Sequence, residues 1–299
     1  MAKIQKNRYL KTKNKKLFYY LCSMITHPIA KINLGLNVVE RRSDGYHNLE
    51  TVFFPVPICD ELEVVINSQP SDYDCQLTLE GIAIEGDVQK NLIVKAYQLL
   101  KQDFPDMPRV CARLKKGIPT QAGMGGGSSD GAYMLTMLNE LCGLHLTKEQ
   151  LRGYAARLGA DCAFFIDPQP QYAEGIGEKL SPVSLNLSGW YIGIVRPDVP
   201  VSTKEAYSLI TPKRPAHNCR DIVALSVDQW RNQLVNDFEE GIFQLHPELG
   251  EVKQQLYDLG AVYAAMSGSG SALFGLFREP VALPFGDMFT WFSPLSTNI

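Results

Sequence analysis

Four glycines stand between a β-like run and a helix-like run, and this arrangement limits what the chain can fold into and bind. The segment Ile118–Asp130 reads IPTQAGMGGGSSD. Glycine reaches positive φ freely and lacks a Cβ, so such a loop can lay its backbone N–H groups directly against a ligand. A helix beginning at Ser128 would add unpaired N–H groups and the positive end of its dipole. The segment therefore predicts an anion site, with phosphate as the expected anion.

A purely structural use of the same residues is the alternative. Glycine-rich turns often only connect two elements, and Ser128 and Ser129 are good helix N-caps. Capping and phosphate binding are compatible, because both use the same orphan N–H groups. The order of a strand over Arg109–Lys116, the strand-breaking Pro119, the glycines and a helix favours phosphate binding.

Two common phosphate motifs do not fit the loop. A Walker loop needs a lysine after its last glycine, and none follows Gly127. A dinucleotide fingerprint needs a glycine where Ser128 stands. The loop thus indicates a phosphate site of another kind.

Residues 127–131 also satisfy GxSxG, the nucleophile elbow of α/β-hydrolases. The downstream residues that would complete the order Ser, Asp, His are Asp161 or Asp198 and then His217 or His246. An elbow needs a strand that runs directly into the serine, and here Pro119 and the glycines intervene. We therefore expect no hydrolase site.

Size and composition indicate a globular protein of two domains. The chain has 299 residues, which is long for one core. Its 45% hydrophobic and 20% charged fractions are ordinary, and a net charge of -3 gives no reason to expect nucleic acid. The 7 cysteines lack any CxxC pair and the 5 histidines show no ligand spacing. Neither a disulfide framework nor a zinc site is expected, and a reducing cytoplasm is the simplest location.

The start of the chain differs from the rest. Met1–Lys16 is basic with no acidic residue, and the short apolar run Leu17–Ile25 follows. This resembles the start of a signal peptide, but no small-x-small cleavage site follows. The run is also far shorter than the ~20 residues that span a bilayer. We expect a disordered, dispensable extension over residues 1–23. Translation from Met24 would explain such an extension, but the sequence leaves the start open between Met1 and Met24. A basic arm that touches nucleic acid or membrane is the alternative.

Strand-like runs are grouped early in the chain and helix-like runs later. The predicted strands are Pro28–Val39, Leu49–Ile58, Glu61–Ile66, Gln76–Leu79, Arg109–Lys116, Trp190–Val195, Gly260–Met266 and Ala272–Phe277. The predicted helices are Asn91–Phe104, Ser128–Leu141, Thr147–Leu158, Ser202–Leu209, Asp221–Asn232, Phe238–Leu245 and Glu248–Leu259. Thr147 and Gln150 have the spacing of a capping box. Such grouping argues for an α+β fold rather than a repeating βαβ wind.

Three further places carry reactive side chains, each with an ordinary explanation. Lys31 and Asn33 share one face of a strand, because side chains two apart point together, but a lysine there could merely snorkel at a sheet edge. Tyr46 and His47 form an aromatic turn that could present two rings to a planar ligand or simply be a solvated hairpin. Asp161 precedes an apolar run and could be a helix cap or a partly desolvated base.

Taken together, five segments resemble the GHMP kinases. They are AKINLGL at Ala30–Leu36, DGYHNLET at Asp44–Thr51, the glycine loop at Ile118–Asp130, GADCAFF at Gly159–Phe165 and MSGSGSALF at Met266–Phe274. The resemblance runs from about Met24 to Phe277. The AKINLGL, DGYH and GAD…FF segments narrow it to the diphosphocytidyl kinases of the non-mevalonate isoprenoid pathway. It implies a two-domain α+β fold: a ribosomal-protein-S5-like domain 2 fold over residues 24–170, which binds ATP, and a ferredoxin-like α/β sandwich over residues 171–299.

The resemblance also implies roles for individual residues. Lys31 and Asp161 match the catalytic pair, with Asp161 as general base for the 2-hydroxyl of 4-diphosphocytidyl-2-C-methyl-D-erythritol. The residues that match ATP-binding positions are Lys116, Pro119, Thr120, Gln121, Ala122, Gly123, Met124, Gly125, Gly126, Gly127, Ser128 and Ser129. Those that match the acceptor site are Asn33, Tyr46, His47 and Asp161, and Gly268, Ser269 and Gly270 match a closing loop of the second domain. Mg²⁺ would arrive with ATP and meet Ser129; no carboxylate ligand for it is assigned.

The implied partners are ATP and the diphosphocytidyl alcohol, with no tightly bound prosthetic group, no nucleic acid and no membrane. The expected state is a cytoplasmic monomer or weak homodimer. Two alternatives remain: a GHMP kinase acting on mevalonate, homoserine or a sugar, and a nucleotide-binding module without transfer. The chain departs from the family at Gly131, where alanine is usual, which should loosen the helix by up to ~1 kcal/mol.

Overall fold

The computed structural model describes residues 23–67 and 72–296, and the chain divides into two compact units. Unit 1 takes Met1–Ile29, Ile58–Thr120 and Gly126–Asp167, and unit 2 takes Ala30–Pro57, Gln121–Gly125 and Pro168–Ile299. The mixture of separate sheets and helices confirms the predicted α+β class. The predicted domains are two continuous stretches of sequence that meet at residue 170, whereas each of these units combines several separate segments. The predicted domain boundary therefore stays a prediction. The extension predicted over residues 1–23 lies outside the described residues up to residue 22.

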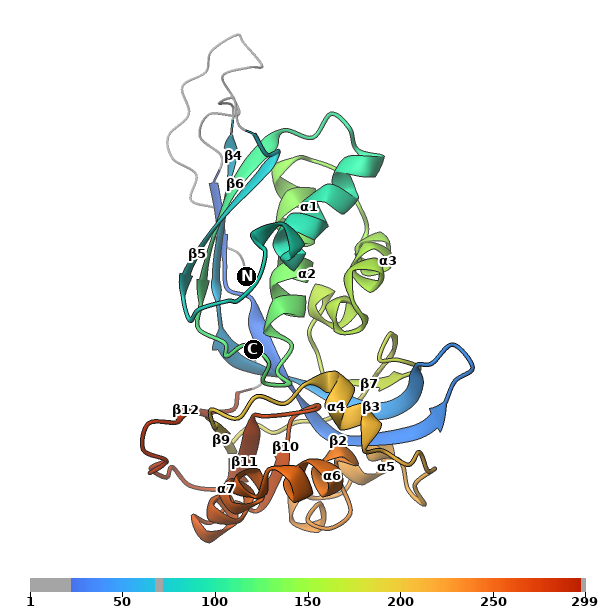
Figure 1. The fold of residues 1–299 in the computed structure, drawn as a ribbon, viewed down its shortest axis with the longest axis vertical. Coiled ribbons are helices and arrows are strands. Elements are labelled where there is room, and N and C mark those ends of the chain that lie inside the picture. Colours follow the sequence, from blue (N-terminus) through green and yellow to red (C-terminus); the bar gives the residue numbers. More distant parts are fainter. Residues whose placement is uncertain (1–22, 68–71, 297–299) are drawn as a thin grey trace. The chain divides into compact units, whose positions relative to one another are not determined.

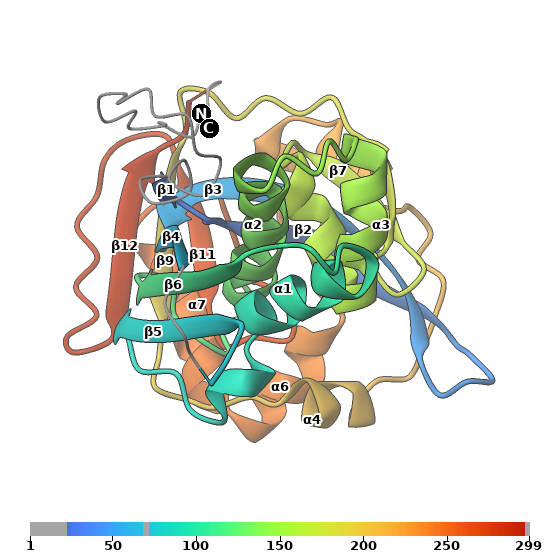
Figure 2. The ribbon, with the colours of Figure 1, turned by 90° about the horizontal axis from the view of Figure 1, so that it is seen from above.

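Unit 1 is a four-stranded sheet with helices on one face. The sheet has the order β1-β4-β6-β5, and only the β5–β6 pair is parallel. Its strands are β1 (Ser23–Thr26), β4 (Glu61–Asn67), β5 (Cys75–Gly81) and β6 (Arg109–Lys116). Its helices are α1 (Leu92–Asp103), α2 (Gly126–Leu141) and α3 (Lys148–Leu158), with short 3-10 helices η2 (Val88–Lys90) and η3 (Ala160–Ile166). Figures 1 and 2 show α1 and α2 lying along the sheet.

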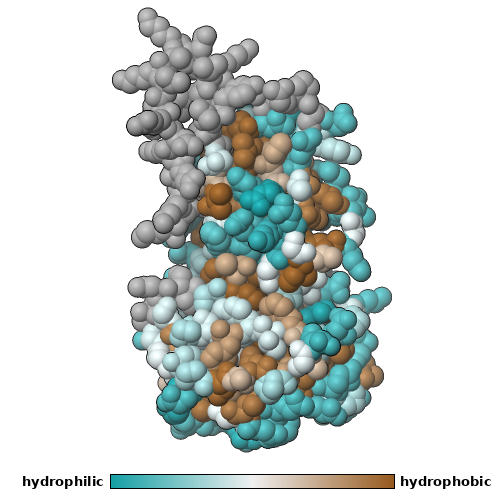
Figure 3. All heavy atoms as spheres, turned by 90° about the vertical axis from the view of Figure 1, so that its left-hand side faces the viewer, coloured by the Kyte–Doolittle hydropathy of each residue, from teal (hydrophilic) through white to brown (hydrophobic). Residues whose placement is uncertain are grey.

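Strict alternation decides which side of this sheet is buried. In β6, Val110, Ala112 and Leu114 are buried, and Lys116 follows them on the same face. The opposite face is polar: Arg113 pairs there with three glutamates of the neighbouring strands. Figure 3 shows that side of the molecule, where hydrophilic residues lie among hydrophobic ones. The period of two therefore brings a lysine onto the core face, where a lone ammonium would be costly.

Unit 2 contains two four-stranded sheets, with the orders β10-β11-β9-β12 and β2-β3-β7-β8. The strands of the first are β9 (Tyr191–Arg196), β10 (Tyr263–Met266), β11 (Leu273–Phe277) and β12 (Phe289–Pro294). The strands of the second are β2 (Ile29–Arg41), β3 (His47–Cys59), β7 (Gln171–Glu174) and β8 (Lys179–Pro182). The helices are α4 (Thr203–Ser208), α5 (Cys219–Val223), α6 (Phe238–Leu245) and α7 (Pro247–Asp258), with the 3-10 helix η4 (Val227–Gln229). The core forms where α6 and α7 meet β10 and β11 (Figure 1).

Most predicted elements are confirmed, but the bounds of two predicted helices were wrong and four strands were missed. The helix predicted to begin at Ser128 begins at Gly126, so the prediction of its start was wrong. The helix predicted over Asp221–Asn232 was also wrong: α5 ends at Val223. The buried Trp230 explains the break, because its indole N–H donates to the carbonyl of Leu225 at 3.2 Å and takes an acceptor that a continuous helix would use. Strands β1, β7, β8 and β12 were missed.

The capping box predicted at the start of α3 is confirmed. The Thr147 hydroxyl accepts from the Gln150 N–H at 3.2 Å, and the Gln150 side chain accepts from the Thr147 N–H at 2.9 Å. Both orphan donors are thereby satisfied within four consecutive residues. Local spacing was enough to predict this contact.

Gly131 has a packing role that its helix propensity does not show. It lies in α2, and a Cβ built there would be 3.0 Å from the Leu92 Cβ of α1. That atom is attached directly to the backbone, so it can move away only if the helix moves. Glycine at this position therefore allows α1 and α2 to approach closely.

We expect Gly131→Ala to destabilise the protein. Alanine favours a helix by up to ~1 kcal/mol over glycine, but forcing a methyl into a tight helix contact costs about 1–3 kcal/mol. Gly153→Ala in α3 is the matched control, since nothing lies within 4 Å of its added Cβ, and it should stabilise. Urea unfolding of both variants measures the difference; a Gly131→Ala protein as stable as Gly153→Ala would contradict the packing role.

Candidate active site

The glycine loop joins β6 to α2 and leaves the first turn of the helix open. Gly123 and Gly125 both have φ of 70°, a conformation that side chains disfavour. Because α2 begins at Gly126, its first N–H groups have no partner within the helix. Gly127 is exposed, and nothing lies within 4 Å of a Cβ built on it. The helix start is thus accessible to an anion.

Ser128 and Ser129 lie inside α2, so the interpretation that they cap it was wrong. Ser129 is fully buried, and its hydroxyl has no hydrogen-bond partner among the described residues. An orphaned buried hydroxyl is unusual and calls for a group that completes it. The same placement excludes a nucleophile elbow, since β6 ends at Lys116 and the serine is buried within a helix.

The middle residues of the loop belong to unit 2 and are held there by backbone hydrogen bonds. The Met124 carbonyl accepts from the Lys31 N–H at 3.0 Å, and the Ala122 carbonyl accepts from the Ala272 N–H at 3.2 Å. The exposure of the other predicted loop residues varies: Pro119 is buried, Thr120 is half-buried and Gln121 is exposed with φ of 51°. These contacts hold the middle of the loop in one conformation.

Lys31 on β2 is buried, not at a sheet edge. Only 3% of it is exposed, and its ammonium donates to the Asn33 Oδ1 at 2.6 Å and the Gly123 carbonyl at 2.8 Å. The ring of Phe53 lies 5.1 Å from the ammonium. The prediction that Lys31 and Asn33 share a face is therefore confirmed, and the snorkelling alternative is excluded.

The serine-glycine loop between β10 and β11 contacts the glycine loop through Ser267. Its hydroxyl donates to the Gly123 carbonyl at 2.9 Å and accepts from the Asn33 N–H at 3.3 Å. A Cβ on Gly123 would lie 1.9 Å from the Ser267 carbonyl oxygen, so only glycine fits there. Lys31, Asn33, Gly123 and Ser267 thus form one hydrogen-bonded group.

The rest of this second loop is shaped by Asn236. Its buried amide donates to the carbonyls of Met266 and Gly268, both at 2.8 Å. Gly268 and Gly270 have φ of 57° and 93°, and the Ser269 hydroxyl lies 3.3 Å from the Thr203 hydroxyl. Asn236 was not identified from the sequence, because nothing in its local sequence marks a residue that shapes a distant loop.

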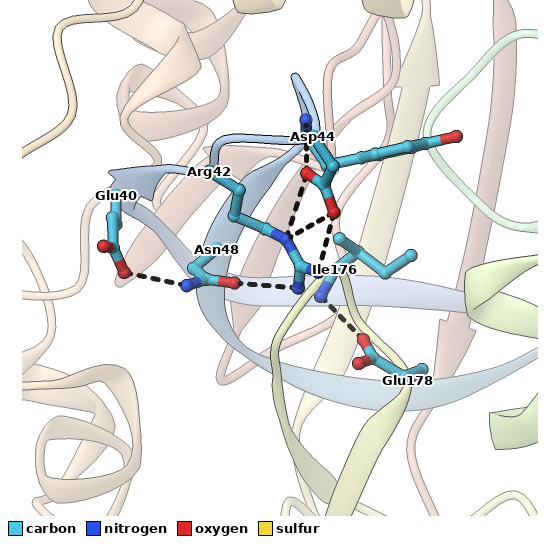
Figure 4. Close-up of polar contacts among 7 residues, drawn as sticks. Glu40, Arg42, Asp44, Asn48, Ile176 and Glu178 are labelled. Atoms are coloured by element: carbon cyan, nitrogen blue, oxygen red, sulfur yellow. Dashed lines mark hydrogen bonds and ion pairs between the residues drawn. The ribbon is translucent and has the colours of Figure 1, made fainter.

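The turn between β2 and β3 presents an exposed ring. Arg42 binds Asp44 at 2.7 Å, and the Asp44 carboxylate accepts from the Tyr46 N–H at 3.1 Å. Figure 4 shows this pairing, with Asn48 between Glu40 and Arg42. Hydrogen bonds from the Arg42 guanidinium lower the pKa of Asp44. Tyr46 is 61% exposed, so its ring is free of packing against the core.

His47 is half-buried and stacks on Tyr207 of α4, with ring centroids 4.9 Å apart and planes 21° apart. Tyr207 in turn meets Phe238 edge-on at 4.9 Å. Burial, and then the charge of Arg41, lower the pKa of His47 below its usual 6.5, so the ring is neutral near pH 7. Tyr207 was missed at the sequence level; its position follows from the cap of α4 by Ser202.

Asp161 lies in the first turn of η3, in unit 1. The apolar residues after it are buried, whereas Asp161 is only partly buried, and Gly159 occupies the N-cap position. Within unit 1, η3 packs against α2. Asp161 therefore lies on an element that contacts α2.

Lys116 is part of a buried charge cluster with Asp60 and Asp130, which was not identified from the sequence. Its ammonium donates to Asp60 and, at 2.9 Å, to Asp130; all three side chains are at most 3% exposed. Asp60 also accepts from the N–H groups of Gly117 at 2.7 Å and Ile118 at 2.8 Å. Burial raises the pKa of Asp130 to about 8. One cation thus faces one carboxylate and one carboxyl group that keeps its proton at pH 7.

We expect Asp130→Asn to remove a pH dependence of stability. The folded pKa of about 8 lies above the ordinary 3.8, so the native state binds an extra proton between these values. The stabilisation that comes from this proton is fully present below about pH 4 and is lost as the pH rises through 8. The free energy of unfolding then falls by at most about 1.4 kcal/mol per pH unit. Urea unfolding between pH 5 and 8 measures it; a variant that keeps the wild-type slope would show that Asp130 is not the titrating group.

Two kinds of site are not found in the part of the chain that the structure describes. No cluster of three or more His, Cys, Asp or Glu residues there could hold a metal ion. Among the same residues, no helix is both long and apolar enough to pass through a bilayer.

Comparison with known proteins identifies the family. Residues 91–167 match the model of the GHMP kinases N terminal domain, and residues 220–283 match that of the GHMP kinases C terminal. A 4-diphosphocytidyl-2-C-methyl-D-erythritol kinase of Bacteroides fragilis is 53% identical over 85% of this chain and 92% of its own length. One of Parabacteroides distasonis is 47% identical over 91% of this chain and 100% of its own.

Solved structures agree. The crystal structure of a 4-(cytidine 5'-diphospho)-2C-methyl-D-erythritol kinase has a TM-score of 0.70 and 33% identity, and covers 85% of this chain and 90% of its own. A mevalonate kinase of L. major shares only the fold, with a TM-score of 0.62 at 16% identity over 93% of this chain and 90% of its own. The chain therefore belongs to the GHMP kinases, ATP-dependent kinases of small molecules, among the relatives named 4-diphosphocytidyl-2-C-methyl-D-erythritol kinase.

Proposed function

We propose that this protein transfers the γ-phosphoryl group of ATP to the 2-hydroxyl of 4-diphosphocytidyl-2-C-methyl-D-erythritol, in the non-mevalonate isoprenoid pathway. The names of its relatives, at 47–53% identity, support the choice of acceptor. The observation that carries the proposal is the open first turn of α2, where Gly127 leaves space and the hydroxyl of Ser129 has no partner among the described residues.

The glycine loop and the start of α2 form the ATP half of the proposed site. Phosphoryl transfer depends mainly on positioning and on stabilising charge, because its transition state is loose. The N–H groups of the first turn and the helix dipole suit the phosphates, at about 0.3–2 kcal/mol for such a contact. Mg²⁺ would accompany ATP and offset part of its negative charge, and the orphaned oxygen of Ser129 is the kind of hard ligand that would hold it.

Asp161 and Lys31 are the proposed catalytic pair. The packing of η3 against α2 supports a place for Asp161 near the transferred phosphoryl group. A general base at this position accepts the proton of the acceptor hydroxyl, an effect worth about 10²–10⁴ in rate. Lys31 would orient Asp161 and keep it ionised, since a nearby cation lowers the pKa of a carboxyl.

The acceptor half would use the residues of the β2–β3 turn. The exposed ring of Tyr46 offers a flat surface for cytosine, and neutral His47 offers one donor and one acceptor to its edge. Tyr207 orients the His47 ring by stacking on it. Asn33 lies beside Lys31 in the hydrogen-bonded group described above and would contact the acceptor from there. A site that hydrogen-bonds a polar edge strongly rejects analogues that lack it.

Gly268, Ser269 and Gly270 are proposed to close the site from the second loop. We further propose that the protein acts in the cytoplasm as a monomer or weak homodimer. A kinase of another alcohol remains the second candidate, because mevalonate kinases share the fold. A module that only binds nucleotide would give no reason for the buried Lys31.

Turnover of Mg-ATP with a panel of alcohols tests the function. We expect ADP to form with 4-diphosphocytidyl-2-C-methyl-D-erythritol and not with mevalonate, homoserine or galactose, because only the first carries a cytosine. Coupled detection of ADP measures this. ADP formation with one of the other alcohols alone would refute the proposed acceptor, and no turnover with tight Mg-ADP binding would favour a binding module.

Asp161→Asn tests the proposed base. We expect turnover to fall at least about 100-fold, the low end for a lost general base, while the Kd for Mg-ADP changes little. Asp167→Asn is the matched control, because Asp167 ends the same 3-10 helix and its carboxylate binds the exposed Lys148 at 2.9 Å. Turnover measurements with both variants decide the point: equal rates would remove Asp161 from the mechanism.

A further inference from the structure

The cluster of Lys116, Asp60 and Asp130 has no role in the reaction as proposed above. Each of its side chains is at most 3% exposed, and the hydrogen bonds of Asp60 and Lys116 go to each other, to Asp130 and to the backbone that follows β6. Removing water from three ionisable groups is costly, and such clusters rarely add stability over apolar residues of the same size. Its presence therefore suggests a task other than stability.

Asp60 fastens the start of the glycine loop. It follows β3, and both of its oxygens are used: Oδ1 accepts from the N–H groups of Gly117 and Ile118, and Oδ2 accepts from Lys116. Gly117 and Ile118 are the first residues after β6. The direction in which the chain leaves the sheet is therefore set by one carboxylate.

The other side of the cluster fastens the end of the loop. Asp130 binds Lys116 from the first turns of α2. Gly126, the first residue of that helix, lies so close to the lysine that a Cβ built on it would be 3.1 Å from the ammonium. Lys116 thus binds Asp130 and lies close to Gly126, and all of these residues belong to unit 1.

We propose that Lys116 and Asp60 are positioning residues that hold the two ends of the glycine loop at a fixed separation, so that Lys116 acts through the loop and does not bind the nucleotide itself. The proposal rests on the proposed function only in taking the loop as the phosphate site. It revises the role of Lys116 that the family resemblance implies. It also assigns a role to Asp60.

The geometry around Asp60 makes a sharp variant possible. The hydrogen-bond partners that the structure shows for its two oxygens are all donors: two N–H groups at Oδ1 and an ammonium at Oδ2. Asparagine has one oxygen and one NH₂ group, so in either orientation it turns a donor toward a donor. Asp60→Asn should therefore distort the loop, and Lys116→Met in the same chain should relieve it, because the introduced asparagine can then turn its oxygen to Gly117 and Ile118.

The test is the affinity of Asp60→Asn, Lys116→Met and the double variant for Mg-ADP, measured by calorimetry without the acceptor. We expect Asp60→Asn to weaken binding at least about tenfold, and the double variant to return to within about threefold of wild type. A double variant that binds as weakly as Asp60→Asn, or more weakly, would overturn the proposal, because Lys116 would then contact the nucleotide itself. Nucleotide binding stays measurable even if the proposed acceptor is wrong.

Two controls separate positioning from loss of structure. Asp74→Asn removes a carboxylate from an exposed ion pair with Arg109 and should leave the Kd unchanged. In turnover assays, Asp60→Asn should raise KM for ATP and leave KM for the acceptor within about twofold, whereas general unfolding would lower kcat alone. If Asp60→Asn does not fold, the Kd of the double variant for Mg-ADP still tests the proposal. A Kd within about threefold of wild type supports it, and a Kd about tenfold higher overturns it.

Discussion

A cation on the buried face of β6 is the constraint around which the proposed phosphate site is organised. The alternation that buries Val110, Ala112 and Leu114 also buries Lys116, at the point where the strand ends. A buried ammonium requires a counter-charge and hydrogen-bond acceptors; Asp60 supplies the charge and Asp130 a second acceptor, from either side of the glycine loop. Because the Lys116 ammonium needs these acceptors, it determines where the loop starts and where the next helix begins.

A second group of contacts, within unit 2, holds the middle of the same loop. The carbonyl of Gly123 accepts from both Lys31 and Ser267, and the Met124 carbonyl accepts from the Lys31 N–H. Glycine is the only residue type that fits at position 123, since a Cβ would strike the Ser267 carbonyl at 1.9 Å. The glycines therefore serve two purposes. Gly123 allows close approach of protein backbone, and Gly127 leaves room for a ligand.

Local patterns were enough to predict much of the fold. The bounds of β6 follow from alternation, those of α1 from the helix predicted over Asn91–Phe104, to within one residue at each end, and the α3 cap from the spacing of Thr147 and Gln150. The shared face of Lys31 and Asn33 follows from the period of two. In each case the cause lies within a few residues of the effect.

The remaining features depend on contacts between distant segments. Asp60 is one acidic residue among many in the sequence, and only the pairing of β4 with β6 brings it to Lys116. Tyr207 and Asn236 gain meaning only beside His47 and the serine-glycine loop. The start of α2 was placed two residues late, because serine is the better cap by local preference and the tertiary structure begins the helix at Gly126.

The central claim is that the first turn of α2 holds the phosphates of the nucleotide. Amide hydrogen exchange tests it directly, by comparing the free protein with the protein saturated with Mg-ADP. We expect exchange to slow at the amides of residues 125–129 and to stay unchanged along α7, which has no part in the proposed site. Unchanged exchange at residues 125–129 under conditions where Mg-ADP is bound would contradict the claim.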